Sequence, residues 1–211
     1  MNILHIDSSP FASTSTSRML GAKFIAALRQ KYADVQVIHR DVGLNPPNHL
    51  SAAAMQAMRS GQNNDLPESV TAEIAEIDWA IQELMTCDML VIGAPMYNHS
   101  IPSHLKAWID QVCQARRTFK YGPHGPVGLV DDKPVFIISS RGNLYSTEAL
   151  REHDFQEPFL VSILGLMGLK NVTVIRAEGI GLSEQHRAQA IEKAEQQITE
   201  LVRAEKYLLA A

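Results

Sequence analysis

A loop rich in hydroxyl side chains lies close to the N-terminus and has the composition of an anion-binding site. It follows the apolar run of residues 2–6 and leads into a segment in which Leu20, Phe24 and Leu28 recur at a spacing of four, as in an amphipathic helix. The free N–H groups and the positive dipole end at the start of a helix attract anions such as phosphate. The hydroxyl side chains of this loop belong to Ser8, Ser9, Ser13, Thr14, Ser15, Thr16 and Ser17.

The loop lacks the motifs and the basic residues that are typical of dinucleotide and triphosphate sites. It contains neither GxGxxG, which marks dinucleotide sites, nor GxxxxGKS/T, which marks nucleoside-triphosphate sites. It also has no Lys or Arg between Met1 and Ser17, so a triphosphate would have no counter-charge. A monophosphate held by hydroxyl and amide groups therefore fits best, and a loop that only caps the helix is the alternative.

Two later loops, residues 94–103 and 140–147, also follow apolar runs. Backbone groups that leave a sheet can hydrogen-bond the edge of a planar heterocycle, and Met96 and Tyr97 offer polarizable or flat surface to such a ring. Gly142 permits close approach of the backbone. Together the three loops describe a monophosphate beside a flat, polar ring system, which is the outline of flavin mononucleotide (FMN).

Short apolar runs alternate with amphipathic segments and predict the elements that must position these loops. Strands are expected at residues 2–6, 35–42, 89–93, 134–139 and 171–177. Parallel strands need crossover connections, so the alternation predicts an α/β fold with a mostly parallel sheet covered by helices on both faces. Ligands bind such sheets outside the carboxyl ends of the strands, where the three loops are expected to converge.

The remaining segments carry helix and turn signals. Pro67 is expected to start a helix, while Ser103 and Ser183 are expected to cap two others. Residues 43–66 are irregular with a short helix near 52–58, and residues 114–133 form a loop or small hairpin. These two segments are additions to a core that needs only about 140–150 residues.

Composition limits the class of protein and its partners. The 211 residues, 45% of them apolar, fit one domain spanning residues 1–211. The net charge of −4, without long runs of like charge, does not favour binding to nucleic acid or to an anionic membrane. No apolar run is long enough to form a membrane-spanning helix. Cys87 and Cys113 are expected to be buried thiols in a reducing cytoplasm. No metal is expected, because His5 and His39 are more typical of structural residues.

The motifs of the three loops carry a family resemblance. They are Ser8-Ser9 with Ser15-Thr-Ser17, Ala94-Pro-Met-Tyr-Asn98, Ile101-Pro-Ser-His-Leu-Lys-Ala-Trp-Ile-Asp110, Phe119-Lys-Tyr-Gly122 and Ser140-Arg-Gly142. The chain resembles the FMN-dependent NADH-azoreductases and NAD(P)H quinone reductases of the flavodoxin-like superfamily. The resemblance implies a doubly wound, five-stranded parallel sheet in the order 2-1-3-4-5.

The resemblance also implies a set of site residues. The FMN phosphate is expected at Ser9, Ser15, Thr16 and Ser17, and the isoalloxazine ring at Pro95, Met96, Tyr97, Asn98 and His99 together with Ser140, Arg141, Gly142 and Asn143. A homodimer is implied, with each flavin in one subunit and roofed by the other. The aromatic rings proposed for this roof are Phe119, Tyr121, Phe155 and Phe159.

The activity implied is two-electron, ping-pong hydride transfer from NADH or NADPH, through FMN, to quinones and azo compounds. Asn98 and the amides near Gly142 are expected to orient the flavin, while His99, Tyr145 and water are the candidate proton donors. His99 and Asn143 depart from the family pattern, which has Phe and Gly there. Asn143 is expected to keep the loop shape because Asn tolerates positive φ.

Three other functions fit the sequence less well. A flavodoxin-like electron carrier without its own organic substrate would be shorter and more acidic. A hydrolase would need a GxSxG turn, which is missing around Ser139, Ser140 and Ser146. A receiver domain would need a phosphate-accepting Asp at a strand end, whereas Asp88 stands at a strand start.

Overall fold

The computed structural model describes residues 1–61 and 65–204 of the chain. The predicted irregular segment at 43–66 and the predicted domain end at residue 211 therefore fall partly outside the described residues. The elements in chain order are β1 (Asn2–Asp7), α1 (Thr16–Lys31), β2 (Gln36–Asp41), α2 (Ala52–Ser60), α3 (Glu68–Thr86), β3 (Met89–Pro95), α4 (Ser103–Val112), β4 (Phe119–Gly122), β5 (Gly125–Gly128), β6 (Val135–Arg141), α5 (Glu148–Arg151), α6 (Glu157–Met167), β7 (Val172–Glu178) and α7 (Glu184–Arg203).

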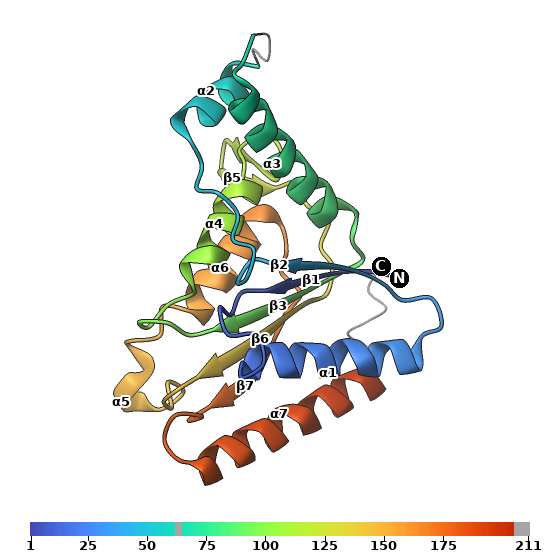
Figure 1. Cartoon of the computed structure of the whole chain (residues 1–211), viewed down its shortest axis with the longest axis vertical. Coiled ribbons are helices and arrows are strands. Elements are labelled where there is room, and N and C mark those ends of the chain that lie inside the picture. Colours follow the sequence, from blue (N-terminus) through green and yellow to red (C-terminus); the bar gives the residue numbers. More distant parts are fainter. Residues whose placement is uncertain (62–64, 205–211) are drawn as a thin grey trace.

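A five-stranded sheet in the order β2-β1-β3-β6-β7 forms the centre of the molecule. Each of its neighbouring pairs is parallel, so β6 and β7 are the fourth and fifth strands of the predicted order. Helices α1 and α7 cover one face, and α3, α4 and α6 cover the other (Figure 1). The predicted doubly wound α/β fold is confirmed.

Alternation along the strands explains the two cores. Leu90 and Ile92 of β3 pack toward α3, α4 and α6, whereas Met89 and Val91 pack toward α1 and α7. The strand is buried throughout and reads as a continuous apolar run, as expected for a central parallel strand.

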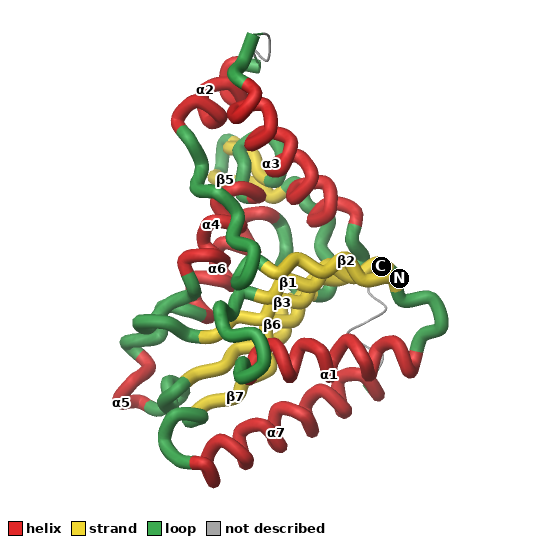
Figure 2. Tube along the Cα trace, viewed as in Figure 1, coloured by secondary structure: helices red, strands yellow, loops and turns green. Residues whose placement is uncertain are grey.

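The two added segments lie on the α3, α4 and α6 side of the sheet (Figure 2). The predicted hairpin is present as β4 paired with β5, and the N–H of Val130 that follows it donates to the carbonyl of Met167 at the end of α6 (3.0 Å). The predicted short helix is present as α2 and packs against α3. Both additions therefore lie on the same face of the sheet as α4, the helix that follows the loop after β3 (Figure 1).

Two local predictions were wrong. Pro102, and not Ser103, is the N-cap of α4, and no side chain caps this helix. Proline locks its own φ and sets the extended entry to the helix, which makes Ser103 the first helical residue. Cys113 is half-buried, because it lies just beyond the end of α4, whereas Cys87 is buried as expected. Among the described residues, no helix has the length and apolar character to cross a membrane.

Candidate active site

The loops that follow β1, β3 and β6 lie side by side at the carboxyl edge of the sheet (Figure 1). The hydroxyl of Ser8 donates to the carbonyl of Gly93 (2.6 Å), which joins the first loop to the end of β3, just before the second loop. The N–H of Met96 donates to the carbonyl of Ser140 (2.8 Å), which joins the second loop to the third. The predicted convergence is therefore present.

The first turn of α1 has the features of a phosphate site. Ser15 caps the helix by accepting from the N–H of Arg18 (3.3 Å), and its hydroxyl lies 3.1 Å from that of Ser17. The first turn contains no acidic residue. The hydroxyl of Thr16 is buried and has no hydrogen-bond partner, which is costly unless a ligand supplies one. This unpartnered hydroxyl fits an anionic group at the helix start.

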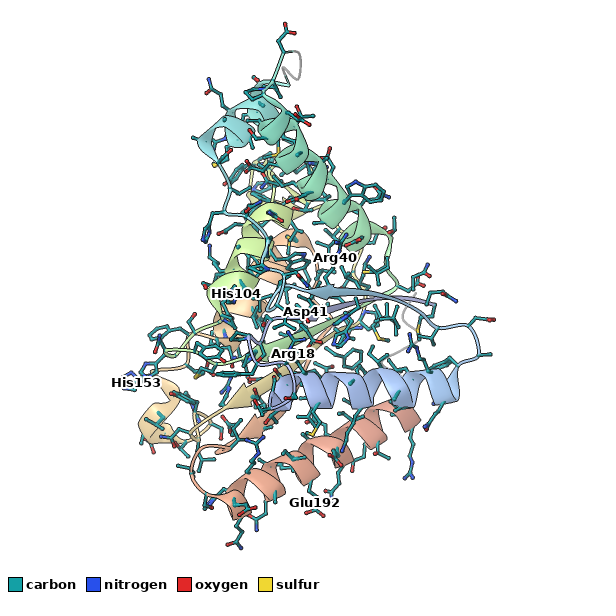
Figure 3. The ribbon with its side chains drawn as sticks, viewed as in Figure 1. Arg18, Arg40, Asp41, His104, His153 and Glu192 are labelled. Atoms are coloured by element: carbon teal, nitrogen blue, oxygen red, sulfur yellow. The ribbon has the colours of Figure 1, made fainter. Side chains whose placement is uncertain are left out.

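Arg18 shapes the loop and does not present a free charge to a ligand. Its guanidinium binds both carboxylate oxygens of Asp41 (2.5 and 2.6 Å) and donates to the carbonyl of Ser9 through Nη2 (2.7 Å). Figure 3 shows Arg18 and Asp41 between the sheet and the start of α1. Gly43 is required beside them, since a Cβ there would lie 2.1 Å from the carbonyl oxygen of Ser9. The ion pair and the glycine thus fix the backbone that precedes the hydroxyls predicted to bind phosphate.

Asp41→Ala tests this support through its pH dependence. Burial would raise the pKa of Asp41, but hydrogen bonds from Arg18 and from the N–H of Leu44 outweigh it, so the pKa is lowered. Because the folded-state pKa lies below the unfolded one, the stabilisation is full above the unfolded pKa and is lost as pH falls through the folded value. We expect Asp41→Ala to lower the free energy of unfolding by about 1.5–3 kcal/mol at neutral pH.

Urea unfolding from neutral to acidic pH measures this difference, which should shrink below about pH 4. Asp131→Ala, at an exposed position, is the control and should change little at any pH. A pH-independent difference between Asp41→Ala and the parent protein would show that the charge of Asp41 is not what stabilises the loop.

The second loop is a tight turn from Tyr97 to Ser100. The two residues exchange backbone hydrogen bonds of 2.9 Å, and the central residues Asn98 and His99 have φ values of 47° and 68°. Positive φ at both central positions defines a type I′ turn, for which Asn is well suited and His less so. The side chains of Asn98 and His99 consequently stand exposed at the tip of the loop.

Asn143 does not use the positive φ that Asn tolerates. Among the described residues, the non-glycine residues with positive φ are Asp65, Asn98, His99 and Arg116. The side chain of Asn143 instead accepts from the N–H of Leu144 (2.9 Å), which stabilises the turn locally without a left-handed backbone. The departure from glycine at this position therefore costs no backbone strain.

The third loop is hydrogen-bonded to the turn after β7 on one side, and its other side is open at Gly142. The carbonyl groups of Arg141 and Gly142 accept from the N–H groups of Ile180 and Gly181 (3.1 and 3.0 Å), in the turn that follows β7. A Cβ built on Gly142 would meet no atom within 4 Å. Its exposed face can therefore accept a flat ring at close range, which fits the predicted isoalloxazine position.

The side chain of Arg141 points away from this face. It is buried with 1% exposure and forms ion pairs with Asp154 (3.0 Å), Glu157 (2.5 Å) and Glu178 (3.1 Å). Only its backbone is available to a cofactor. The network instead joins the end of β6 to the start of α6, a role that sequence spacing did not reveal.

Three aromatic rings meet at the mouth of the site. The ring of His99 lies 5.7 Å from that of Tyr145 in an edge-on arrangement and 5.2 Å from that of His153. The N–H of Phe155 donates to the carbonyl of His99 (2.9 Å), so the segment after α5 is tied to the second loop. His153, which Figure 3 places at the outer edge by α5, could not be predicted as a neighbour of His99, because no local pattern links the two residues.

The four proposed roof residues differ in exposure. Phe119 is buried with 8% exposure and meets Tyr121 edge-on at 5.5 Å, while Tyr121 is 79% exposed and Phe155 is 58% exposed. Phe159 is half-buried and lines a cavity of about 670 Å³ together with Tyr97, Asn98 and the start of α4. The described structure thus leaves Tyr121 and Phe155 available for contact with another molecule.

Comparison with known proteins places these observations in a family. The family model described as a flavodoxin-like fold matches residues 1–202. The FMN-dependent NADH:quinone oxidoreductase of Azospirillum brasilense is 46% identical over 202 residues, covering 95% of this chain and 97% of the relative. That of Chromobacterium violaceum is 44% identical, covering 95% and 99%.

Solved structures agree on the fold. A crystal structure of an azoreductase from Bacillus anthracis superposes with a TM-score of 0.87 at 23% identity, covering 97% of this chain and 99% of that one. An FMN complex of an FMN-dependent NADH-azoreductase from Bacillus anthracis gives 0.85 at 20% identity, covering 95% and 99%. The topology, the three converging loops and the family model agree, and the chain belongs to the flavodoxin-like fold family.

Proposed function

We propose that this chain is an FMN-dependent NADH:quinone oxidoreductase. The observation that carries the proposal is its 46% identity, over nearly the whole of both chains, to a relative of that name. The site is compatible with the cofactor: the Thr16 hydroxyl lacks a partner at the start of α1, and the face of Gly142 is open. These two features are where a phosphate and a flat ring would be bound.

The residues that would hold FMN come from all three loops. Ser9, Ser15, Thr16 and Ser17 would bind the phosphate, since their hydroxyls and the helix N–H groups gather there. The ring would lie against residues 95–99 and 140–143. Bound FMN would supply the hydride chemistry, accepting two electrons from NADH and passing them to the acceptor.

The chain's own groups would orient the reactants and deliver protons. The type I′ turn presents the amide of Asn98 and the imidazole of His99 on the same exposed tip. His99 and Tyr145 are in ring contact, so either can hold a proton near an acceptor seated at this mouth, and water remains an alternative donor. The adjoining cavity of about 670 Å³ is large enough for a quinone-sized ring.

Steady-state turnover tests the proposed activity. Purified holoprotein is assayed with NADH or NADPH against a benzoquinone, a naphthoquinone and an azo dye, the second acceptor class implied by the sequence resemblance. Parallel double-reciprocal lines with a quinone are expected for a ping-pong reaction. If NADH is consumed only when a protein electron acceptor is added, the electron-carrier alternative is favoured instead.

We also propose a homodimer whose subunits roof each other's sites. The support is the exposure of two large aromatic side chains, Tyr121 (79%) on the β4–β5 hairpin and Phe155 (58%) beside the second loop. Light scattering is expected to give twice the chain mass of 23.3 kDa. Tyr121→Arg should shift the protein toward monomer, whereas Leu182→Arg, at another exposed apolar position, should not; equal effects would remove Tyr121 from the interface.

Substitution of His99 is expected to change acceptor preference more than FMN affinity. The imidazole stands at the mouth, so its loss should alter relative kcat/KM among quinones and azo dyes by about 10-fold or more. His99→Asn keeps a residue that tolerates the φ of 68°, while His99→Phe adds backbone strain. A shift shared by both variants reports the lost imidazole; uniform rate changes across all acceptors would place His99 outside the acceptor site.

The two free thiols indicate the kind of cellular compartment in which the protein works. Cys87 and Cys113 are free thiols that follow different helices, α3 and α4, which supports the proposal of a reducing compartment such as the cytoplasm.

A further inference from the structure

A group of side chains able to bind a metal ion lies on β1 and β2, directly before the loop of residues 8–17. His5 and Asp7 are on β1, and His39 is the register partner of His5 on the edge strand β2. The imidazole and carboxylate atoms of these three residues all lie within 4.8 Å of one another. The spacing along the chain gave no hint of this, because the parallel pairing of β1 with β2 brings the residues together.

Two of these groups are buried without a hydrogen-bond partner. His5 and Asp7 are each 5% exposed, and neither Nε2 of His5 nor Oδ1 of Asp7 is hydrogen-bonded. The two atoms are 3.7 Å apart, which is too long for a hydrogen bond. Buried polar atoms are almost always hydrogen-bonded. Two buried, unpartnered ligand atoms that face each other therefore indicate a position where a bound ion could contact both.

The third side chain gives access from solvent. Nε2 of His39 lies 2.9 Å from Oδ2 of Asp7, and its side chain is 48% exposed at the edge of the sheet. The ring of His5, in contrast, is fixed against Gly21 of α1, where a Cβ would lie 2.8 Å from Nε2. One ligand is therefore free to adjust while the other two are held in place.

The local charge favours a cation. Arg18 lies 3.6 Å from Oδ2 of Asp7, but its guanidinium is paired with both oxygens of Asp41. The two carboxylates outnumber the one guanidinium, so the charged groups beside His5 carry a net negative charge, which favours a cation.

We propose that His5, Asp7 and His39 form a binding site for a divalent transition-metal ion of the zinc type. Two imidazole nitrogens and one carboxylate, with water in the fourth position, are a known ligand set for Zn²⁺. Bonds of about 2.0–2.2 Å bring ligand atoms to about 3.3–3.5 Å from one another, so a modest movement of His39 completes the site. Binding exchanges the His39–Asp7 hydrogen bond for metal bonds and satisfies both orphan atoms.

Cobalt titration of the holoprotein tests the site, because Co²⁺ replaces Zn²⁺ and has a visible spectrum when bound by nitrogen and oxygen ligands. After treatment with a chelator and its removal, one Co²⁺ per chain is expected to bind with visible absorption bands. Zn²⁺ should displace it and raise the Tm, whereas Mg²⁺, which prefers oxygen ligands, should do neither.

His39→Gln is the main variant, since the side chain is half exposed and its loss should leave the fold intact. We expect it to weaken Co²⁺ binding by roughly 100-fold or more. His153→Gln and His186→Gln are matched controls, because each removes a histidine elsewhere on the surface, and both should bind Co²⁺ as the parent does. His5→Gln gives a second, independent loss of ligand.

The proposal is overturned if the parent protein binds no Co²⁺, or if His39→Gln and His5→Gln bind it as well as the parent. It is also overturned if His153→Gln removes the signal, because the ion would then be bound at the mouth of the active site. Failure of the quinone reductase assay would not affect these outcomes, since metal binding is measured independently of turnover.

Discussion

Replacing Arg141 with methionine is expected to lower the free energy of unfolding by about 3–5 kcal/mol, the cost of leaving buried charges without their partner. Arg141 is 1% exposed, and its guanidinium is the shared cation of Asp154, Glu157 and Glu178. Of these, Glu157 keeps an ion pair with Arg176, whereas Asp154 and Glu178 have no other ion pair among the described residues. Urea unfolding of the cofactor-free protein measures the loss.

Arg117→Met is the matched control for this prediction. Arg117 pairs with Asp78 on the surface at 2.6 Å, and an exposed pair of this kind is worth at most about 1 kcal/mol. A loss for Arg141→Met no larger than that of Arg117→Met would mean that the network is not a source of stability. In that case the third loop would have to be held mainly by its backbone bonds to the turn after β7.

Thr16→Val is expected to weaken FMN binding by roughly 10- to 100-fold while leaving riboflavin binding unchanged, because a hydrogen bond to a charged group is worth about 1.5–3 kcal/mol. The substitution keeps the shape of the side chain and removes only the buried hydroxyl that has no partner in the protein. Riboflavin lacks the phosphate and therefore reports on the ring site alone.

Stability of the cofactor-free protein provides a second readout for the same variant. Removing an unsatisfied buried hydroxyl should leave the free energy of unfolding equal or higher, so any loss of FMN affinity cannot be blamed on damage to the fold. Thr14→Val, at an exposed position in the same loop, should leave both affinities unchanged. Equal weakening of FMN and riboflavin by Thr16→Val would contradict a phosphate at this helix start.

The sheet and the position of the site could be predicted because both depend on local patterns. Continuous apolar runs such as residues 89–93 mark central parallel strands, and the topology then places the loops that follow them at one edge. Ser183 was correctly predicted as a helix cap because capping acts over three or four residues. The features predicted correctly are therefore those set by interactions between residues that are close in the sequence.

The features that could not be predicted depend on contacts between distant residues. The ion pairs of the Arg141 side chain were not predicted, because its partners Glu157 and Glu178 come from two later elements. The pair of His5 and His39 depends on the register of β1 with β2. The type I′ turn at Asn98 and His99 was missed because the glycine that usually marks such turns is absent.

Anaerobic rapid mixing of the purified protein tests the central claim most directly. The account predicts that the protein carries FMN, that one equivalent of NADH bleaches the flavin absorbance, and that one equivalent of a quinone restores it within the time of a catalytic cycle. A protein that does not bind FMN, or whose bleached absorbance a quinone does not restore, would contradict the assignment of this chain as an FMN-dependent NADH:quinone oxidoreductase.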